Sequence, residues 1–190
     1  MTGLFLVIFG YAVGERIGEL FLSRRNRAVM RSRGFAQREP LRSLALMAGM
    51  HALWLASSLA EATLAPVELP IWVAIAAAVL FAAAQALRFW TLRTLGSHWN
   101  VSVMTGAKGA STFVSNGPYR YIRHPNYLVV ILEIVSLPLI GGAVVTATLF
   151  SVLNAIVLFS RIKIEEQHLR AVPGYWDTMQ SKPRFIPGLG

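Results

Sequence analysis

Residues that could bind or activate a ligand are concentrated between Asn116 and Tyr127, in a segment that reads NGPYRYIRHPNY. Its twelve residues include three tyrosines, two arginines and one histidine. Its glycine and two prolines interrupt helical structure, because proline lacks an amide N–H and restricts the residue before it. The segment lies between two long apolar regions, so the pattern predicts a polar binding site at the surface of a membrane.

A second polar cluster, RIKIEEQHL, follows the last apolar region and runs from Arg161 to Leu169. On a helix, Arg161 and Glu165 are four residues apart and share a face. If the two polar segments meet, arginine can bind a carboxylate, glutamate can bind an ammonium group, and tyrosine rings can pack on a cation or a flat ring. S-adenosylmethionine carries all of these groups. The alternative is that these residues only anchor the chain at the membrane interface.

The composition indicates an integral membrane protein. Of the 190 residues, 55% are hydrophobic and 14% are charged, whereas soluble domains carry about 25% charged residues. The net charge is +9, but the basic residues flank apolar spans, so contact with anionic lipid is expected and nucleic-acid binding is not. The absence of cysteine excludes disulfides, thiolate metal sites and cysteine nucleophiles. No cleavable signal peptide and no obligate protein partner are expected.

The apolar pattern predicts an all-α membrane protein with about five transmembrane helices and a cytoplasmic, cofactor-binding C-terminal region. At ~1.5 Å per residue, about 20 residues cross a ~30 Å hydrocarbon core. Residues 1–190 are expected to form a single membrane domain. It would consist of three N-terminal spans in residues 1–95 and a catalytic core in residues 96–190, with a helical hairpin over 128–160. The predicted spans are Thr2–Leu22, Ser43–Leu64, Pro70–Leu95, Leu128–Ile140 and Ala143–Ser160.

The distribution of positive charge predicts how the chain is oriented. Residues 23–42 are expected to form a basic loop, and residues 88–93 to return the chain to the same side, whereas the turn over 61–69 carries no basic residue. Seventeen of the 18 basic residues then lie on one side. We therefore expect a bacterial inner-membrane protein whose N-terminus is outside and whose active site faces the cytoplasm. The loop arginines are Arg24, Arg25, Arg27, Arg31, Arg33, Arg38 and Arg42.

Several ionisable residues lie inside the predicted spans. Glu15 and Glu19 share a helix face, so they lie either near the interface beside a snorkelling Arg16 or on a polar cavity. Glu133 lies within an apolar helix, and an intramembrane carboxylate indicates a functional site. His51 has no second ligand three or four residues away, so we expect it to hydrogen-bond a neighbouring helix rather than bind a metal.

The sequence GPYRYIRHPNYL, the apolar hairpin after it, RIKIEEQHL and the terminal PRFIP together resemble the isoprenylcysteine carboxyl methyltransferase family of integral membrane enzymes. The resemblance covers about residues 95–187. It implies a five-span core, S-adenosylmethionine as the methyl donor, and methyl transfer to an oxygen of a lipophilic acceptor, either a carboxylate or a phenol or enol. No metal site is implied.

Site residues are carried over by position in the matching motifs. The resemblance implies catalytic roles for Arg161, Glu166 and His124. The residues expected to bind the cofactor are Gly117, Tyr119, Tyr121, Arg123, His124, Pro125, Tyr127, Glu165 and Tyr175. Residues 172–179 lack the second tyrosine of the family pattern, and the acidic run has only two residues. These departures favour a small lipid acceptor over a prenylated protein, as in bacterial members associated with long-chain polyketide phenols or pyrones.

The chemistry of the acceptor decides which groups are needed. A carboxylate requires only an arginine such as Arg161 to orient it, whereas a phenol or enol requires a base, for which His124 and Glu166 are candidates. Three alternatives stay open: a lipid-amine N-methyltransferase, an NADPH-dependent membrane reductase of the sterol reductase type, and a scaffold or carrier that binds neither cofactor. The reductase would need a phosphate site, for which the isolated Lys108 offers little.

Overall fold

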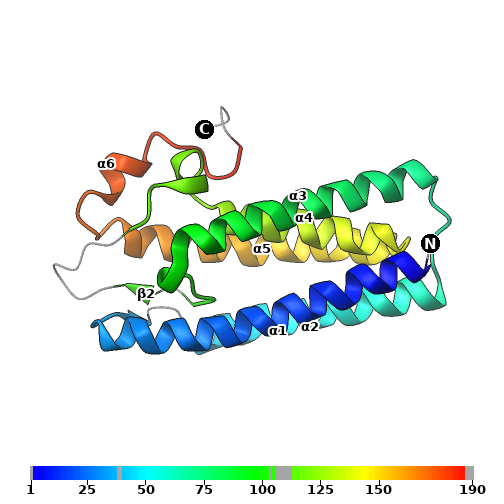
Figure 1. Ribbon diagram of the computed structural model, residues 1–190, viewed down its shortest axis with the longest axis horizontal. Helices are drawn as coiled ribbons and strands as arrows, with labels where there is room; N and C mark the ends of the chain where they lie inside the picture. Colours follow the sequence, from blue (N-terminus) through cyan, green and yellow to red (C-terminus); the bar gives the residue numbers. More distant parts are fainter. Residues whose placement is uncertain (1, 38–39, 103, 106–112, 187–190) are drawn as a thin grey trace.

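The computed structural model describes residues 2–37, 40–102, 104–105 and 113–186. Its long helices are α1 (Thr2–Ser32), α2 (Leu41–Leu64), α3 (Ile71–Leu95), α4 (Pro125–Ile140) and α5 (Val144–Leu169). These helices lie side by side in an elongated bundle (Figure 1). The N-terminus and the α2–α3 connection lie at one end of the bundle, and the short helix α6 (Tyr175–Met179) and the C-terminal segment lie at the other.

Three of the described helices are long and apolar enough to cross a membrane: α2, α3 together with the turn that follows it, and α5. The helix α4 is apolar but has 16 residues, about 24 Å at ~1.5 Å per residue. The helix α1 has 31 residues but carries several charged side chains. The chain is therefore a mostly helical integral membrane protein, and the crossing of all five helices stays a prediction.

Prolines mark where three of the helices begin. Pro40 and Pro70 lie directly before α2 and α3. Pro125 is the first residue of α4, where its missing amide N–H costs no helical hydrogen bond. Gly141 and Gly142 then turn the chain into α5, and the φ of Gly142 is +76°, a conformation that favours glycine. The hairpin between α4 and α5 thus forms where these residues indicate it.

The first connection is shorter than predicted, because α1 continues through Ser32. The expectation that residues 23–32 lie in a loop is therefore wrong. Arginine and methionine are good helix formers, and the segment after α3 holds this extension in place. Asn26 Nδ2 donates to Gly96 O at 3.1 Å and to Trp99 O at 2.8 Å. The extension thereby positions the residues that follow α3.

A short antiparallel pairing was not predicted from the sequence. It joins β1 (Ala36–Gln37) to β2 (Met104–Thr105), with Ala36 opposite Thr105. The pairing ties the connection after α1 to the segment after α3, at the end of the bundle that holds the C-terminal segment. Lys108, which was considered for a phosphate site, lies outside the described residues.

The helix α4 packs inside the bundle. Ile134 and Leu137 have no exposed surface and belong to one buried cluster with Phe5 of α1 and Trp54 of α2. Trp54 Nε1 donates to Ile134 O at 3.2 Å, which fixes α2 against α4. In lipid such close packing, rather than escape from water, holds helices together.

A network of charged side chains joins α1, α3 and α4. The Arg88 guanidinium is 1% exposed, donates from Nε to Glu133 Oε1 at 3.0 Å, bonds to Glu19, and lies 3.4 Å from Glu15. Arg16 donates to Glu19 Oε2 at 2.9 Å and bonds to Glu133. Each buried charge in this network therefore faces an opposite charge, as burial requires.

The network settles two expectations. Arg88 was expected to return the chain to the basic surface, and this is wrong, because its side chain is buried against Glu133. Of the two alternatives for Glu15 and Glu19, the polar-cavity interpretation holds for Glu19, which lines a cavity together with Arg16. The carboxylate of Glu133 is held by its partners rather than exposed to a ligand.

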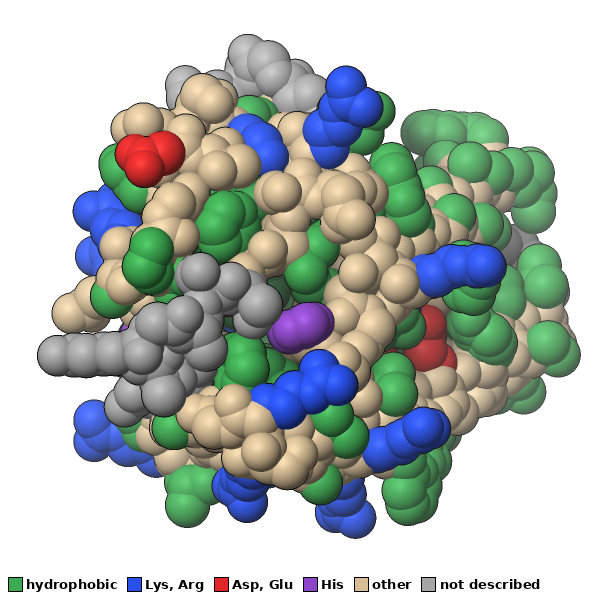
Figure 2. All heavy atoms as spheres, turned by 60° about the vertical axis from the view of Figure 1, so that its left-hand side comes forward, with side chains coloured by type: hydrophobic (Ala, Val, Ile, Leu, Met, Phe, Trp, Pro, Cys, Tyr) green, Lys and Arg blue, Asp and Glu red, His purple; other side chains and the backbone are tan. Residues whose placement is uncertain are grey.

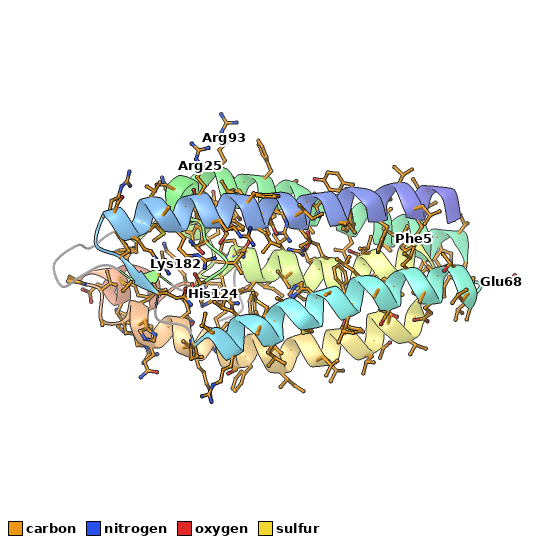
Figure 3. The ribbon with its side chains drawn as sticks, turned by 90° about the horizontal axis from the view of Figure 1, so that it is seen from below. Phe5, Arg25, Glu68, Arg93, His124 and Lys182 are labelled. Atoms are coloured by element: carbon orange, nitrogen blue, oxygen red, sulfur yellow. The ribbon has the colours of Figure 1, made fainter. Side chains whose placement is uncertain are left out.

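Charge is distributed unevenly along the bundle. Lys and Arg side chains surround the end that faces the viewer in Figure 2, whereas the part of the bundle behind it is mostly hydrophobic. Arg25 of α1 and Arg93 of α3 project outward on the same side of the bundle, at about the same position along its length as His124 (Figure 3). Glu68 lies at the opposite end of the bundle. This agrees with the predicted orientation of the chain in the membrane, and that orientation stays a prediction.

Candidate active site

The motif that follows α3 packs directly against that helix. Residues Gly117–Arg120 form a single turn, η2, with Gly117 at a φ of +55°. A Cβ at Gly117 would lie 2.3 Å from Thr94 Oγ1 of α3. Only glycine permits both this backbone conformation and this approach. Gly117 therefore sets how closely the motif lies to the bundle.

The C-terminal segment closes over the same motif. Arg123 N donates to Pro183 O at 2.9 Å, and His124 N donates to Arg184 O at 3.1 Å. Lys182 Nζ donates to Tyr119 O, in the η2 turn, at 2.9 Å. The segment just before α4 and the end of the described chain are therefore held together by backbone hydrogen bonds.

Glu166, near the end of α5, joins these two segments through its side chain. Its Oε1 lies 3.1 Å from His124 Nε2, 3.1 Å from Arg123 Nη1 and 3.0 Å from Arg184 Nε. Its Oε2 accepts from Arg184 Nη2 at 2.8 Å. The structure thus brings the two predicted polar clusters together, since residues 42 positions apart share a hydrogen bond.

Next to Glu166, the side chains of His124, Tyr127 and Arg161 extend the site into the bundle. The Tyr127 hydroxyl donates to Glu165, and its ring stacks on the His124 ring with centroids 5.3 Å apart. The Arg161 guanidinium lies over the Tyr127 ring, 5.7 Å from the ring centroid. Arg161 also donates to Val101 O at 2.8 Å. His124, Tyr127 and Arg161 therefore form one continuous row.

The environment fixes the protonation of groups around this row. Burial raises the pKa of the Tyr119 phenol above its ordinary value, and the carboxylate of Glu165 raises it further. Burial likewise raises the pKa of Tyr175, with contributions from Glu165 and Glu166. The hydrogen bond to Glu166 raises the pKa of Arg184. Both phenols therefore keep their protons and can donate hydrogen bonds to a ligand.

A cavity of about 430 Å³ connects this row to the interior of the bundle. Its volume lies within the ~300–1,000 Å³ range of small-molecule sites. Polar and aromatic residues line the part near the C-terminal segment: Tyr119, His124, Tyr127, Arg161, Glu165 and Tyr175. Apolar residues from four helices line the rest: Leu20, Met47, Leu55, Val130, Val157 and Leu158. A polar ligand and an apolar chain could therefore share the cavity.

Three buried polar atoms of cavity-lining residues have no hydrogen-bond partner in the described part of the chain. They are the donors Trp99 Nε1 and Arg123 Nε and the acceptor Asn126 Oδ1. Buried polar atoms are rarely left unpaired, because each costs about 1–3 kcal/mol. Each of these atoms has almost no accessible surface, so a ligand in the cavity would contact other atoms of these side chains.

Not every predicted site residue reaches the cavity. Tyr121 is 52% exposed and packs against Trp90, with ring centroids 6.3 Å apart. Gly117 and Pro125 are absent from the cavity wall and shape the backbone around it. Glu166 is also absent from the wall and contacts the residues behind it.

Other residues of the site were not predicted as such from the sequence. Arg184 lies in the PRFIP motif, but nothing local indicates that it binds Glu166. Trp99 lines the cavity, although it lies outside the two polar clusters on which the sequence-based prediction of the site depended. His51 also lines the cavity, and its Nδ1 bonds to Met47 of its own helix, so the expected bond to a neighbouring helix is wrong.

Comparison with known proteins identifies relatives over most of the chain. YpbQ of Bacillus subtilis (strain 168), an uncharacterised protein, is 33% identical over 168 residues, which cover 88% of this chain and 97% of YpbQ. The cobalt-zinc-cadmium resistance protein CzcN of Cupriavidus metallidurans is 28% identical over 100 residues, 52% of this chain and 46% of CzcN. This chain thus matches about half the length of CzcN and nearly all of YpbQ.

A solved structure and a family profile agree with these matches. The eukaryotic intramembrane Ras methyltransferase ICMT superposes with a TM-score of 0.55 at 20% identity, over 78% of this chain and 50% of that one. At this identity the superposition shows a shared fold. The profile of the isoprenylcysteine carboxyl methyltransferase (ICMT) family matches residues 74–171, which include both polar clusters and the hairpin between them. The chain therefore belongs to the ICMT family of membrane methyltransferases.

Proposed function

We propose that this protein transfers a methyl group from S-adenosylmethionine to an oxygen of a lipophilic acceptor. The observation that carries the proposal is the cavity, which joins a polar, aromatic end to an apolar interior. A polar methyl donor and an acceptor with an apolar chain can meet in such a cavity. Methyl transfer at the membrane by this family supports the same conclusion.

The residues at the polar end fit the methyl donor. Arg123 lines this end and provides a guanidinium for the carboxylate of the donor, and Asn126 provides a side-chain amide. Glu165 adds a carboxylate, and Tyr119 adds an aromatic face beside it. When bound, S-adenosylmethionine supplies an electrophilic methyl group on a sulfonium.

Glu166 acts in this proposal by positioning its neighbours. Both of its oxygens are engaged, by two guanidiniums and by His124, so it is held as a carboxylate and has no free lone pair aimed at the cavity. Such charge-assisted bonds fix the direction of Arg123 and His124. This role replaces the expectation that Glu166 removes a proton from the acceptor.

Arg161 is proposed to orient the acceptor oxygen. Its guanidinium lines the cavity between Tyr127 and Met47, where the polar end gives way to the apolar interior. Displacement requires the nucleophilic oxygen within about 3 Å of the methyl carbon and in line with the bond that breaks. The C-terminal segment is hydrogen-bonded to the backbone of His124, and we propose that it excludes water from this junction.

In this proposal the polar part of the cavity faces the cytoplasm, and the basic end of the bundle supports this orientation. Arginines concentrate on this end, and the positive-inside rule directs such segments to the cytoplasm. For a bacterial chain this face belongs to the inner membrane. The acceptor is proposed to be a small lipophilic molecule drawn from the bilayer.

Titration of the purified protein with S-adenosylhomocysteine and with NADPH tests the proposal. Binding of the first alone supports a methyltransferase, binding of NADPH alone supports the reductase alternative, and binding of neither supports a carrier. Incubation with labelled methyl donor and a lipid extract, followed by identification of the product, distinguishes O- from N-methylation.

Replacement of Arg161 tests the assigned geometry. Arg161→Ala should lower methyl transfer by at least about tenfold, because it removes the cation at the junction of the two ends. Lys163→Ala is the matched control, since Lys163 is an exposed cation on the same helix and packs on Phe159. Wild-type turnover by Arg161→Ala would remove the proposed role.

A further inference from the structure

His51 of α2 has a hydrogen bond that fixes which of its ring nitrogens carries a proton. Its Nδ1 lies 2.9 Å from Met47 O. A backbone carbonyl can only accept, so Nδ1 must carry the hydrogen. In the neutral ring Nε2 is then the acceptor, with a lone pair in the ring plane. The described residues provide no further hydrogen-bond partner for Nε2.

The ring is placed where an acceptor would lie. His51 lines the cavity, and Trp54 packs edge-on against it at 83° with centroids 6.3 Å apart. The hydrogen bond and this contact together fix the ring orientation. A histidine that only filled space in the bundle would not need to line a cavity large enough for a ligand.

The position of His51 relative to Arg161 supports a role in the same step. Arg161 contacts the Met47 side chain, one helical turn before His51, and four residues of helix rise about 6 Å. His51 therefore lies one turn further along α2 than the residue that Arg161 contacts, and Tyr127, Arg161 and His51 all line the cavity. In the arrangement that we infer, an acceptor oxygen held by Arg161 lies between the donor site and the His51 ring.

Of the other candidate bases on the cavity wall, the carboxylates are paired, whereas the neutral His124 ring also keeps an acceptor, Nδ1, because its Nε2 bonds to a carboxylate. His124 Nε2 bonds to Glu166 Oε1 at 3.1 Å, and Glu165 accepts from Tyr127. Glu19 is paired with the guanidiniums of the charged network. His98 also lines the cavity but lies edge-on to Phe35, without a described hydrogen bond that fixes its tautomer.

We propose that His51 is the proton acceptor for acceptor molecules that carry a hydroxyl group, such as a long-chain phenol or enol. This inference rests on the proposed function and narrows its substrate class. The acceptor O–H bond breaks and its proton passes to His51 Nε2. The oxygen lone pair forms the new bond to the methyl carbon, and the carbon–sulfur pair stays on sulfur. The imidazolium then releases the proton to water.

Charged groups from each neighbouring element face this ring. Arg16 of α1, Arg88 of α3 and Glu133 of α4 act on it electrostatically, and Arg161 of α5 lies one turn away. The two arginines that line the cavity beside it, Arg16 and Arg161, carry positive charge toward a developing phenolate. They therefore favour loss of the hydroxyl proton, and the neighbouring arginine charge also opposes a positive charge on the His51 ring, so that an imidazolium formed there releases its proton readily.

Rates of methylation of two acceptors that differ in acidity test the proposal. His51→Gln should lower methylation of a long-chain alkyl phenol by about 10²–10⁴-fold, the usual worth of a general base. Methylation of a long-chain fatty acid, which is already ionised at neutral pH, should change by less than about twofold. His168→Gln is the matched control, because His168 Nδ1 makes the same bond to Ile164 O on α5 but does not line the cavity.

A second readout needs no turnover. An alkylated nitrophenol, whose absorbance reports its ionisation, is bound to the protein without cofactor. The bound dye should ionise at lower pH in the wild type than in His51→Gln or His51→Phe, with His168→Gln like the wild type. Identical titrations in the wild type and both His51 variants would overturn the proposal.

The outcomes distinguish a failure of the proposed methyltransferase function from a failure of the His51 role. A wild type that methylates neither the phenol nor the fatty acid overturns the proposed function. A wild type that methylates the phenol as fast as His51→Gln overturns the His51 role alone. Binding of S-adenosylhomocysteine by each variant shows that it is folded, so a loss of phenol methylation with binding retained supports the proposal.

Discussion

Replacement of Arg88 by methionine should be among the most destabilising single changes in the bundle. Arg88 is 1% exposed and faces the carboxylates of Glu133, Glu19 and Glu15. Methionine has a similar length but no charge. The variant would leave two buried carboxylates, Glu19 and Glu133, and the partly buried Glu15 with Arg16 as the remaining cation of the network, so the local net charge would become more negative, from −1 to −2.

The size of the effect follows from this loss of compensation. Removing one partner of a buried ion pair costs about 3–5 kcal/mol, because the remaining charge stays buried. At roughly 2–4 °C per kcal/mol for a chain of this length, the midpoint of thermal unfolding should fall by roughly 6–20 °C. The double variant Arg88→Met/Glu133→Met removes one charge of each sign. It should therefore lose less stability than the sum of the two single variants, by about 0.5–3 kcal/mol.

Thermal unfolding of the purified protein in detergent micelles, followed by circular dichroism, measures these differences. Arg93→Met is the matched control, because Arg93 lies on the same helix, is exposed and packs on Phe89. Its stability should change by less than about 0.5 kcal/mol. Equal midpoints for Arg88→Met and Arg93→Met, or strict additivity in the double variant, would refute the description of the network as a coupled unit.

Three further substitutions address the site. Gly117→Ala should lower the midpoint of thermal unfolding and weaken S-adenosylhomocysteine binding. A positive φ costs at least ~1 kcal/mol in alanine, and the new Cβ would meet Thr94. A variant that behaves as wild type would contradict this packing. Arg184→Gln should weaken the same binding by about fivefold, or ~1 kcal/mol, because its 44% exposed side chain is partly screened from Glu166, and the loss should shrink in high salt. Tyr127→Phe should destabilise the fold by about 1.5–3 kcal/mol in thermal unfolding through loss of its bond to a carboxylate, whereas Tyr121→Phe should have almost no effect.

The positions of the helices could be predicted because their signals are local. A run of apolar residues sets the length of α2, α3 and α5, and Pro40, Pro70 and Pro125 set where helices begin. The hairpin turn follows from Gly141 and Gly142 for the same reason. The meeting of His124 with Glu166 was also predictable, because a tight hairpin returns the chain to the side from which it started.

The end of α1 could not be predicted in this way. Arginine-rich segments between apolar spans are equally compatible with a loop and with a helix that extends from the membrane. Contacts with a distant segment stabilise the helix, since Asn26 bonds to Gly96 and Trp99, which follow α3. Hydropathy carries no information about such contacts.

From the sequence alone come the membrane class, the approximate positions of α2–α5 and the two polar clusters, because each depends on the chemistry of neighbouring residues. The tertiary structure decided which faces of the helices meet. It paired Arg88 with Glu133 across 45 positions, turned Tyr121 to the surface and His51 to the cavity, and brought Arg184 onto Glu166. Helix rotation and packing depend on all neighbours at once, so no local pattern specifies them.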